Sequence, residues 1–173
     1  YPKVGMENSK VSIHIFDTKT KKKVDVDRTS DPDGYIPRIK WTNDPSKLCV
    51  FWMNRHQNHL ELLIANSISG KTTKLLQEEN KYYIDIHDNL TFLQDGQGFI
   101  WTSEQDGFNH IYLYDMSGSL KKQITTGNWE VTSFYGVDEK NKAIYYQSAS
   151  ASPMEREIFS VGLGGVTKKQ LHV

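Results

Sequence analysis

The chain has 173 residues and carries 21 basic and 21 acidic residues, so its formal net charge is zero. With this balance, the chain lacks the excess of basic residues that is typical of proteins that bind nucleic acid or an anionic membrane surface. The single cysteine, Cys49, excludes an internal disulfide and a cysteine-based metal cluster. Aromatic residues make up 12% of the sequence, which suits β-strands better than helices.

Runs of β-forming residues alternate with turn residues along the whole sequence. In chain order, the predicted strands are 11–16, 36–41, 48–53, 60–65, 72–76, 82–86, 91–93, 99–102, 110–115, 120–124, 131–137, 143–147, 158–163 and 166–171. Turn formers such as Asn43-Asp44-Pro45, Asp95-Gly96 and Gly164-Gly165 stand between them. No window of helical length has an apolar period of about 3.6 residues. We therefore predict an all-β chain.

An internal repeat indicates how these strands are grouped. The phrase Asn58-His59-Leu60-Glu61-Leu62 recurs as Asn109-His110-Ile111-Tyr112-Leu113, and a third copy keeps the layout without the Asn-His pair. Repeats of about 40 to 50 residues with several strands each are typical of β-propeller blades. We predict a partial β-propeller, with about three four-stranded antiparallel blades at about 36–77, 81–125 and 131–171. Residues 9–27 form one hairpin of a preceding blade.

Three and a half blades do not close a ring, so we expect residues 1–173 to be a single fragment of a propeller domain. The sequence also opens at Tyr1 without a methionine or a signal peptide, which favours a processed chain or a piece of a longer one. An isolated arc of blades exposes apolar faces at its two ends. We expect such a fragment to self-associate through those faces.

A cluster of aspartates invites interpretation as a calcium loop: Asp25, Asp27, Asp31 and Asp33, followed by Gly34. With the glycine at the invariant turn position, the first ligand position falls on Thr29 and the last on Lys40. Neither supplies the carboxylate that the site requires. We predict a turn with solvated carboxylates, and no metal site.

The six histidines are His14, His56, His59, His87, His110 and His172, and none forms a His-Glu-x-x-His pair. His59 and His110 occupy equivalent positions in two repeats, which favours a structural role in the blade. His87-Asp88 resembles part of a catalytic triad, but adjacent residues of a strand point to opposite faces.

Two further groups suggest binding. Glu78-Glu79 could hold a ligand's ammonium group, although a solvated turn between blades is the favoured interpretation. The aromatic residues that could stack on a sugar or peptide are better explained by core packing: Tyr82, Tyr83, Trp41, Trp52, Trp101 and Trp129. A Gly-x-Ser-x-Gly nucleophile elbow and a phosphate-binding glycine loop are absent from the sequence. We therefore assign no catalytic residue, metal ligand or cofactor, and leave the substrate-binding residues unknown.

Several segments together resemble one family. Tyr1-Pro2-Lys3-Val4-Gly5 is similar to a Tyr-Pro-Lys-x-Gly segment in the propeller of dipeptidyl peptidase IV-type serine exopeptidases. Other segments follow in that family's order: Trp41-Thr42, Arg55-His56-Gln57-Asn58, Phe92-Leu93-Gln94-Asp95-Gly96, Ser103-Glu104, Asp106-Gly107, His110-Ile111-Tyr112 and Thr126-Gly127-Asn128-Trp129-Glu130-Val131. The resemblance covers the chain as the later part of the family's N-terminal propeller.

The resemblance implies a propeller joined to an α/β-hydrolase domain that removes dipeptides from peptide N-termini. The family's paired glutamates precede its Tyr-Pro-Lys segment, so Glu78-Glu79 does not inherit their role. The expected function is that of a non-catalytic propeller portion that gates access of peptide ends to the active site of a longer enzyme. The implied partners are a peptide substrate and the hydrolase domain, with no nucleic acid and no membrane span in this piece, and the implied location is extracytoplasmic.

Two alternatives stay open. The first is a propeller-type module that binds protein or glycan without peptidase activity. The second is a related peptidase of the same superfamily with another specificity. A Gly-x-Ser-x-Gly elbow downstream of this sequence would separate the enzyme from the binding module.

Overall fold

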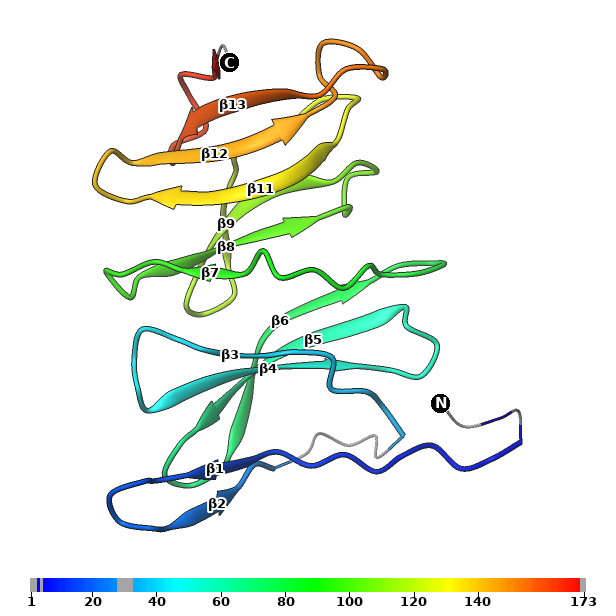
Figure 1. The fold of residues 1–173 in the computed structure, drawn as a ribbon, viewed down its shortest axis with the longest axis vertical. Helices are drawn as coiled ribbons and strands as arrows, with labels where there is room; N and C mark the ends of the chain where they lie inside the picture. Colours follow the sequence, from blue (N-terminus) through cyan, green and yellow to red (C-terminus); the bar gives the residue numbers. More distant parts are fainter. Residues whose placement is uncertain (1–2, 4, 28–32, 172–173) are drawn as a thin grey trace. The chain divides into compact units, whose positions relative to one another are not determined.

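A computed structural model describes residues 3, 5–27 and 33–171 (Figure 1). Tyr1, Pro2, Val4, Asp31 and His172, which entered the sequence predictions, lie outside these residues. The described residues contain no helix that could cross a membrane. The strands are β1 (His14–Phe16), β2 (Lys23–Asp25), β3 (Ile39–Trp41), β4 (Lys47–Met53), β5 (His59–Asn66), β6 (Thr72–Glu79), β7 (Thr91–Phe92), β8 (Gly98–Ser103), β9 (His110–Asp115), β10 (Leu120–Gln123), β11 (Val131–Asp138), β12 (Ala143–Ser148), β13 (Glu157–Gly162) and β14 (Lys169–Leu171).

These strands form one two-stranded hairpin and three four-stranded antiparallel sheets. The hairpin is β1-β2, and the first, second and third sheets are β3-β4-β5-β6, β7-β8-β9-β10 and β11-β12-β13-β14. Every sheet is a meander, in which strands adjacent in sequence are also adjacent in space. The all-β class is confirmed, with the sheets as blades of a partial propeller. The chain divides into two compact units, residues 1–86 and 87–173.

The strand predicted at 82–86 is wrong. Between β6 and β7 the backbone is held by two separate hydrogen bonds, from Asn80 N–H to the Asn58 carbonyl (2.9 Å) and from Ile84 N–H to the Gln57 carbonyl (2.9 Å). No strand pairs with this segment among the described residues. Tyr82 is 77% exposed. A residue with high β propensity stabilises a strand only where it packs against a neighbouring strand or a core, and Tyr82 does not.

The core of residues 87–173 lies between the second and third sheets. It contains buried residues from both: Leu93, Ile100, Ile111, Ile124, Val131, Ile144, Tyr146, Phe159 and Val161. The alternation along β12 explains the contact, because Ile144 and Tyr146 are fully buried while Ala143 and Tyr145 are partly exposed. A side-chain contact also ties the sheets together, since the Glu139 carboxylate accepts a hydrogen bond from Gln94 N–H at 2.9 Å.

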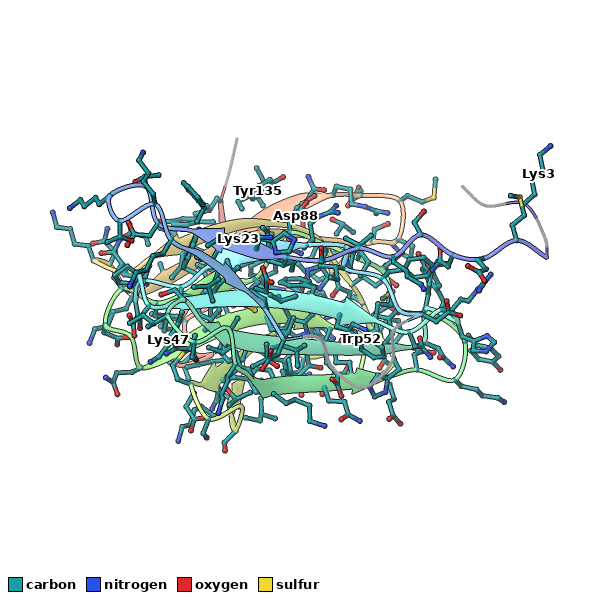
Figure 2. All side chains as sticks on the ribbon, turned by 90° about the horizontal axis from the view of Figure 1, so that it is seen from below. Lys3, Lys23, Lys47, Trp52, Asp88 and Tyr135 are labelled. Carbon is teal, nitrogen blue, oxygen red and sulfur yellow. The ribbon has the colours of Figure 1, made fainter. Side chains whose placement is uncertain are left out.

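In residues 1–86, the β1-β2 hairpin packs on one face of the first sheet (Figure 1). The buried residues on that face are Leu48, Val50, Trp52, Leu63 and Ala65, and Ile13, Ile15, Val26 and Ile36 pack against them. A pocket remains between hairpin and sheet, and its lining is apolar except for Asp27. Side chains such as Lys3 extend at the periphery, whereas Trp52 is only 8% exposed (Figure 2).

The turn between β5 and β6 is built around one side-chain acceptor and one glycine. Asn66 Oδ1 accepts hydrogen bonds from the N–H groups of Ile68 (3.0 Å) and Ser69 (2.9 Å). Gly70 closes the turn by donating to the Asn66 carbonyl at 2.8 Å, with a φ of 74°. The left-handed conformation favours glycine there.

The β9-β10 turn of the second sheet is one residue shorter, but it too has a side-chain acceptor and a glycine in the left-handed conformation. Asp115 Oδ1 accepts from the N–H groups of Ser117 (2.9 Å) and Ser119 (3.0 Å), and Gly118 has a φ of 82°. Two contacts hold the pKa of the Asp115 carboxyl well below its usual range. The hydrogen bond from the Ser117 hydroxyl has the larger effect, and the contact with Lys121 has the next largest. The turns at Ser69-Gly70 and Ser117-Gly118 therefore both depend on the side-chain acceptor that precedes them.

The β1-β2 turn has the same backbone bonds as the β5-β6 turn, but with a lysine in place of the glycine. Asp17 Oδ1 accepts from Lys19 N–H (2.8 Å) and Thr20 N–H (3.0 Å). Lys21 donates to the Asp17 carbonyl at 2.9 Å and has a φ of 58°. Asp17 N–H donates a hydrogen bond to the Lys22 carbonyl at 2.9 Å. In the β5-β6 turn, Asn66 N–H donates to the Lys71 carbonyl in the same way. The basic run at 19–23 thus spans the hairpin tip.

The β3-β4 turn leads to a prediction of pH dependence. Hydrogen bonds from Ser46 and the nearby Lys47 ammonium (3.1 Å) lower the pKa of Asp44 to about 2. A carboxyl whose folded pKa is below its unfolded value of 3.8 stabilises the fold above that value and loses this contribution as pH falls. We expect the difference in Tm between the wild-type chain and Asp44→Asn to shrink from pH 5 to pH 2. A constant difference would contradict this assignment.

Cys49 leads to a second prediction. Its side chain is fully buried in β4, and burial raises the pKa of the thiol to about 12. Only the thiolate reacts quickly with disulfide reagents. We expect Cys49 to react with an aromatic disulfide reagent only as fast as the chain opens, and at once in denaturant. Rapid labelling of the native chain would show that β4 is not buried in solution.

Candidate functional site

The repeated Asn-His phrases have the same backbone role in both repeats. The Asn58 carbonyl accepts a hydrogen bond from Asn80 N–H (2.9 Å), and the Asn109 carbonyl accepts one from Val131 N–H (2.8 Å). Asn58 thus anchors the residue directly after β6, and Asn109 anchors the first residue of β11. This contact is main-chain architecture and requires no ligand.

His110 is a fully buried histidine with both ring nitrogens in use. Its Nδ1 lies 3.0 Å from Thr125 Oγ1 and its Nε2 lies 3.0 Å from the Gly127 carbonyl oxygen. The Trp129 ring packs edge-on at 5.0 Å between centroids. Because Nε2 must donate to a carbonyl, His110 connects β9 to the loop after β10.

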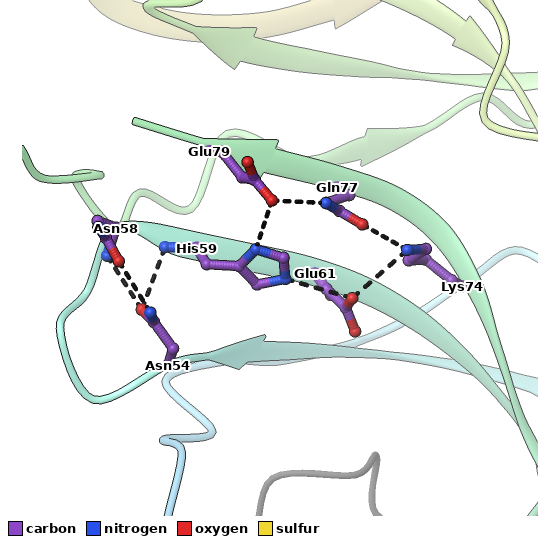
Figure 3. Close-up of polar contacts among 7 residues, drawn as sticks. All are labelled: Asn54, Asn58, His59, Glu61, Lys74, Gln77 and Glu79. Atoms are coloured by element: carbon purple, nitrogen blue, oxygen red, sulfur yellow. Dashed lines mark hydrogen bonds and ion pairs between the residues drawn. The ribbon is translucent and has the colours of Figure 1, made fainter. Parts of the chain in front are cut away.

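His59 occupies the equivalent place at the start of β5 but has charged neighbours (Figure 3). Its Nδ1 lies 3.1 Å from Glu79 Oε1, and its Nε2 lies 3.3 Å from Glu61 Oε1. The imidazole is 24% exposed and packs edge-on against Trp52 at 5.7 Å. Asn54 Oδ1 fixes the preceding turn by accepting from the N–H groups of Asn58 and His59, both at 3.1 Å.

The polar cluster around His59 continues along β6. Lys74 Nζ lies 3.5 Å from Glu61 Oε1 and also contacts the Gln77 amide oxygen. The Gln77 amide donates to Glu79 Oε1 at 2.9 Å. Glu61 lies against both His59 and Lys74, and Glu79 lies against His59, so the cluster joins β5 to β6. We name His59, Glu61, Lys74, Gln77 and Glu79 the β5-β6 polar cluster.

We predicted a turn at Glu78-Glu79, and this prediction is wrong. The two residues are the last two of β6. Glu79 lies opposite His59 in the ladder, and Glu78 lies opposite Leu60. Adjacent residues of a strand point to opposite faces. The two carboxylates therefore do not converge on a shared ammonium group.

Three further candidate residues, His87, Asp25 and Asp33, have contacts within the protein. His87 Nε2 donates to the Thr102 carbonyl at 2.8 Å, and its ring packs on Trp101 at 4.2 Å. Asp25 lies 2.7 Å from His14 Nδ1, and Asp33 lies 3.2 Å from Arg55. Within residues 5–27 and 33–171, no three metal-ligating side chains are grouped so as to hold an ion.

The tryptophans divide between core and surface. Trp101 and Trp52 are buried, as predicted, whereas Trp41 is 50% exposed. The Lys168 ammonium lies 4.6 Å from the centroid of the Trp129 ring and 4.1 Å from the centroid of the Phe159 ring. Their faces are thus occupied by the chain's own lysine.

Comparison with known proteins agrees with this architecture. Residues 1–172 match the family described as the dipeptidyl peptidase IV (DPP IV) N-terminal region. The crystal structure of Porphyromonas gingivalis dipeptidyl peptidase 4 is similar over 100% of this chain and 24% of that chain, with 40% identity and a TM-score of 0.91.

Curated relatives show the same partial coverage. Dipeptidyl peptidase 4 of Arthroderma otae is 26% identical over 93% of this chain and 22% of its own length. The mouse protein named inactive dipeptidyl peptidase 10 is 26% identical over 98% of this chain and 23% of its own length. The chain therefore spans about a quarter or less of these relatives. The matched family and the four antiparallel sheets together show that the chain belongs to the dipeptidyl peptidase IV N-terminal region family.

Proposed function

We propose that this chain is a non-catalytic β-propeller portion of a longer dipeptidyl peptidase IV-like serine exopeptidase. The observation that carries the proposal is the match over the whole chain to the Porphyromonas gingivalis dipeptidyl peptidase 4 structure, at a TM-score of 0.91. Because that chain is about four times longer, the reacting groups of the peptidase belong to other parts of such an enzyme.

In this proposal the sheets form part of a rigid wall that limits access of peptide N-termini to an α/β-hydrolase active site. The side-chain chemistry supports a structural role. His110 and His87 both donate to backbone carbonyls, and His59 lies between two carboxylates, contacts that hold strands and loops of the sheets together. By family resemblance, we place the longer enzyme outside the cytoplasm.

A chromogenic dipeptidyl substrate with proline in second place tests the proposal. We expect no turnover by the 173-residue chain. The longer protein that contains it should cleave the substrate and lose activity with a serine-directed inhibitor. Inhibitor-sensitive cleavage by the 173-residue chain alone would overturn the non-catalytic assignment.

A second candidate is a propeller-type binding module without peptidase activity. The observation that favours it is the mouse relative, whose name describes it as inactive although it matches 98% of this chain. A longer protein that is folded, binds peptide and gives no turnover would support this candidate over the first.

A further inference from the structure

One face of the third sheet carries an aromatic row with an acidic and a basic residue beside it. The ladder places Tyr146 of β12 opposite Phe159 of β13, and Phe159 opposite Gln170 of β14. Residues directly opposite in a ladder share a face, and so do residues two apart on one strand. Glu157 stands two residues before Phe159, and Lys168 stands two residues before Gln170. A carboxylate and an ammonium therefore flank the rings.

The Lys168 ammonium lies over two aromatic rings that come from different segments. Trp129, in the loop between β10 and β11, is 4.6 Å away, and Phe159 on β13 is 4.1 Å away. A cation is attracted to a ring face within about 6 Å of the centroid. Tyr146 stacks on both rings, and His110 packs edge-on against Trp129 at 5.0 Å, which fixes the rings in place. We call the two rings the Trp129-Phe159 cage.

A lysine is an imperfect occupant of this cage. Its ammonium has three N–H donors, and among the described residues its one hydrogen-bond acceptor is Ser150 Oγ, at 2.9 Å. Burial lowers the pKa of Lys168, because the strongly hydrated ammonium loses water there. Thr167, directly before it, has a φ of 63°, which is strained for a β-branched residue. The lysine thus stays in the cage against the loss of hydration and against backbone strain.

Glu157 supplies a negative charge next to the cage. Its Oε1 accepts a hydrogen bond from the Gln170 amide at 2.6 Å. Its Oε2 is buried and has no hydrogen-bond partner among the described residues. The charge of Glu157 favours a cation nearby, since it opposes the lowering of the Lys168 pKa. A cation in the cage stabilises this buried carboxylate through space, and needs no N–H group to do so.

We propose that the Trp129-Phe159 cage, together with Glu157, binds a small quaternary ammonium ion, and that Lys168 is a tethered occupant which this ion displaces. Aromatic cages are the arrangement by which proteins recognise choline and methylated lysine. A quaternary ammonium presents methyl groups to the rings and has no N–H group to leave unsatisfied. All the residues of the site lie within residues 87–173, and the inference does not rest on the proposed function.

Binding of tetramethylammonium chloride, followed by ligand-observed NMR, tests the site in the 173-residue chain. Lys168→Ala empties the cage, so we expect it to bind the ion about tenfold more tightly than the wild-type chain does. Lys81→Ala is the matched control, because Lys81 Nζ lies 5.1 Å from the centroid of a single, exposed ring, that of Tyr82. This variant should bind no more tightly than wild type. No gain in Lys168→Ala, or an equal gain in both variants, would overturn the proposal.

Two further comparisons separate a cation site from an apolar pocket. In the Lys168→Ala background, Glu157→Gln keeps the shape of the side chain and removes its charge, so binding of the ion should become severalfold weaker. Choline should bind to Lys168→Ala, and its neutral isostere, in which carbon replaces the charged nitrogen, should not. Equal binding of choline and the isostere would contradict a cation site.

Displacement of the lysine is measured in the wild-type chain. Ring currents of Trp129 and Phe159 should shift the NMR resonances of the Lys168 ε-methylene group upfield. Saturating tetramethylammonium chloride should return these resonances to the positions of an exposed lysine, and potassium chloride at the same ionic strength should leave them unchanged. Resonances that stay in place at saturation, or that move equally with potassium chloride, would show that the ion does not displace Lys168.

Discussion

Gly70→Ala is expected to destabilise the chain by about 2–5 kcal/mol. Alanine in the left-handed conformation costs about 1–2 kcal/mol, and Gly70 has a φ of 74°. A Cβ there would also overlap the Asp25 carbonyl oxygen, and overpacking of this kind adds about 1–3 kcal/mol. Because the obstacle is a backbone atom of β2, the hairpin must move away from the first sheet.

Gly96→Ala is the matched control. Gly96 also has a positive φ, 69°, but no atom lies within 4 Å of the added Cβ. It should therefore lose only the conformational part, about 1–2 kcal/mol. Urea denaturation at constant m-value measures both variants. Equal losses would mean that the β1-β2 hairpin does not pack against the Gly70 turn in solution.

His110→Ala and His59→Ala should differ sharply although the two histidines are equivalent in the repeat. His110 is fully buried and holds Thr125 and the Gly127 carbonyl. Its loss removes two hydrogen bonds, of which the one to Thr125 is buried, at about 0.5–1.5 kcal/mol each. It also opens a cavity, so we expect a total of about 3 kcal/mol or more. His59 is part of a partly exposed ion-pair cluster, where such pairs contribute about 0–1 kcal/mol.

The midpoints of urea unfolding for the two variants measure this difference. Thr125→Val is a useful companion, because it removes the same hydrogen bond from the other side and should couple to His110→Ala in a double-mutant cycle. If His59→Ala is as destabilising as His110→Ala, the β5-β6 polar cluster holds the sheet together more strongly than its exposure indicates.

Most of the fold could be predicted from the sequence because strand period and turn chemistry agree. The β-forming run at 143–147 and the turn formers Asp95-Gly96 and Gly164-Gly165 are local signals, and the structure has a strand or a turn at each of them. The segment 82–86 misled because Tyr82, Tyr83 and Ile84 are good strand formers. Whether a strand forms there depends on a neighbouring strand, which no local pattern reveals.

The β5-β6 polar cluster was missed for a related reason. The sequence pointed to His59 and to Glu79 but not to Glu61, Lys74 or Gln77. The signal was present in part, since His59-x-Glu61 on one strand faces Gln77-x-Glu79 on the next once the Gly70 turn sets the register. Lys74 joins them only because the ladder shifts by one residue between Leu62 and Leu63, and such a bulge has no signature in this sequence.

Lys21 shows how far a turn can drift in sequence while its backbone stays the same. It adopts the left-handed conformation that Gly70 adopts in the corresponding turn, which costs backbone strain for a residue with a Cβ. The β1-β2 turn thus has the same backbone as the β5-β6 turn, but a less favourable residue at its left-handed position. Engineers who wish to stabilise this protein have a template within its own sequence, and Lys21→Gly is the first change that it suggests.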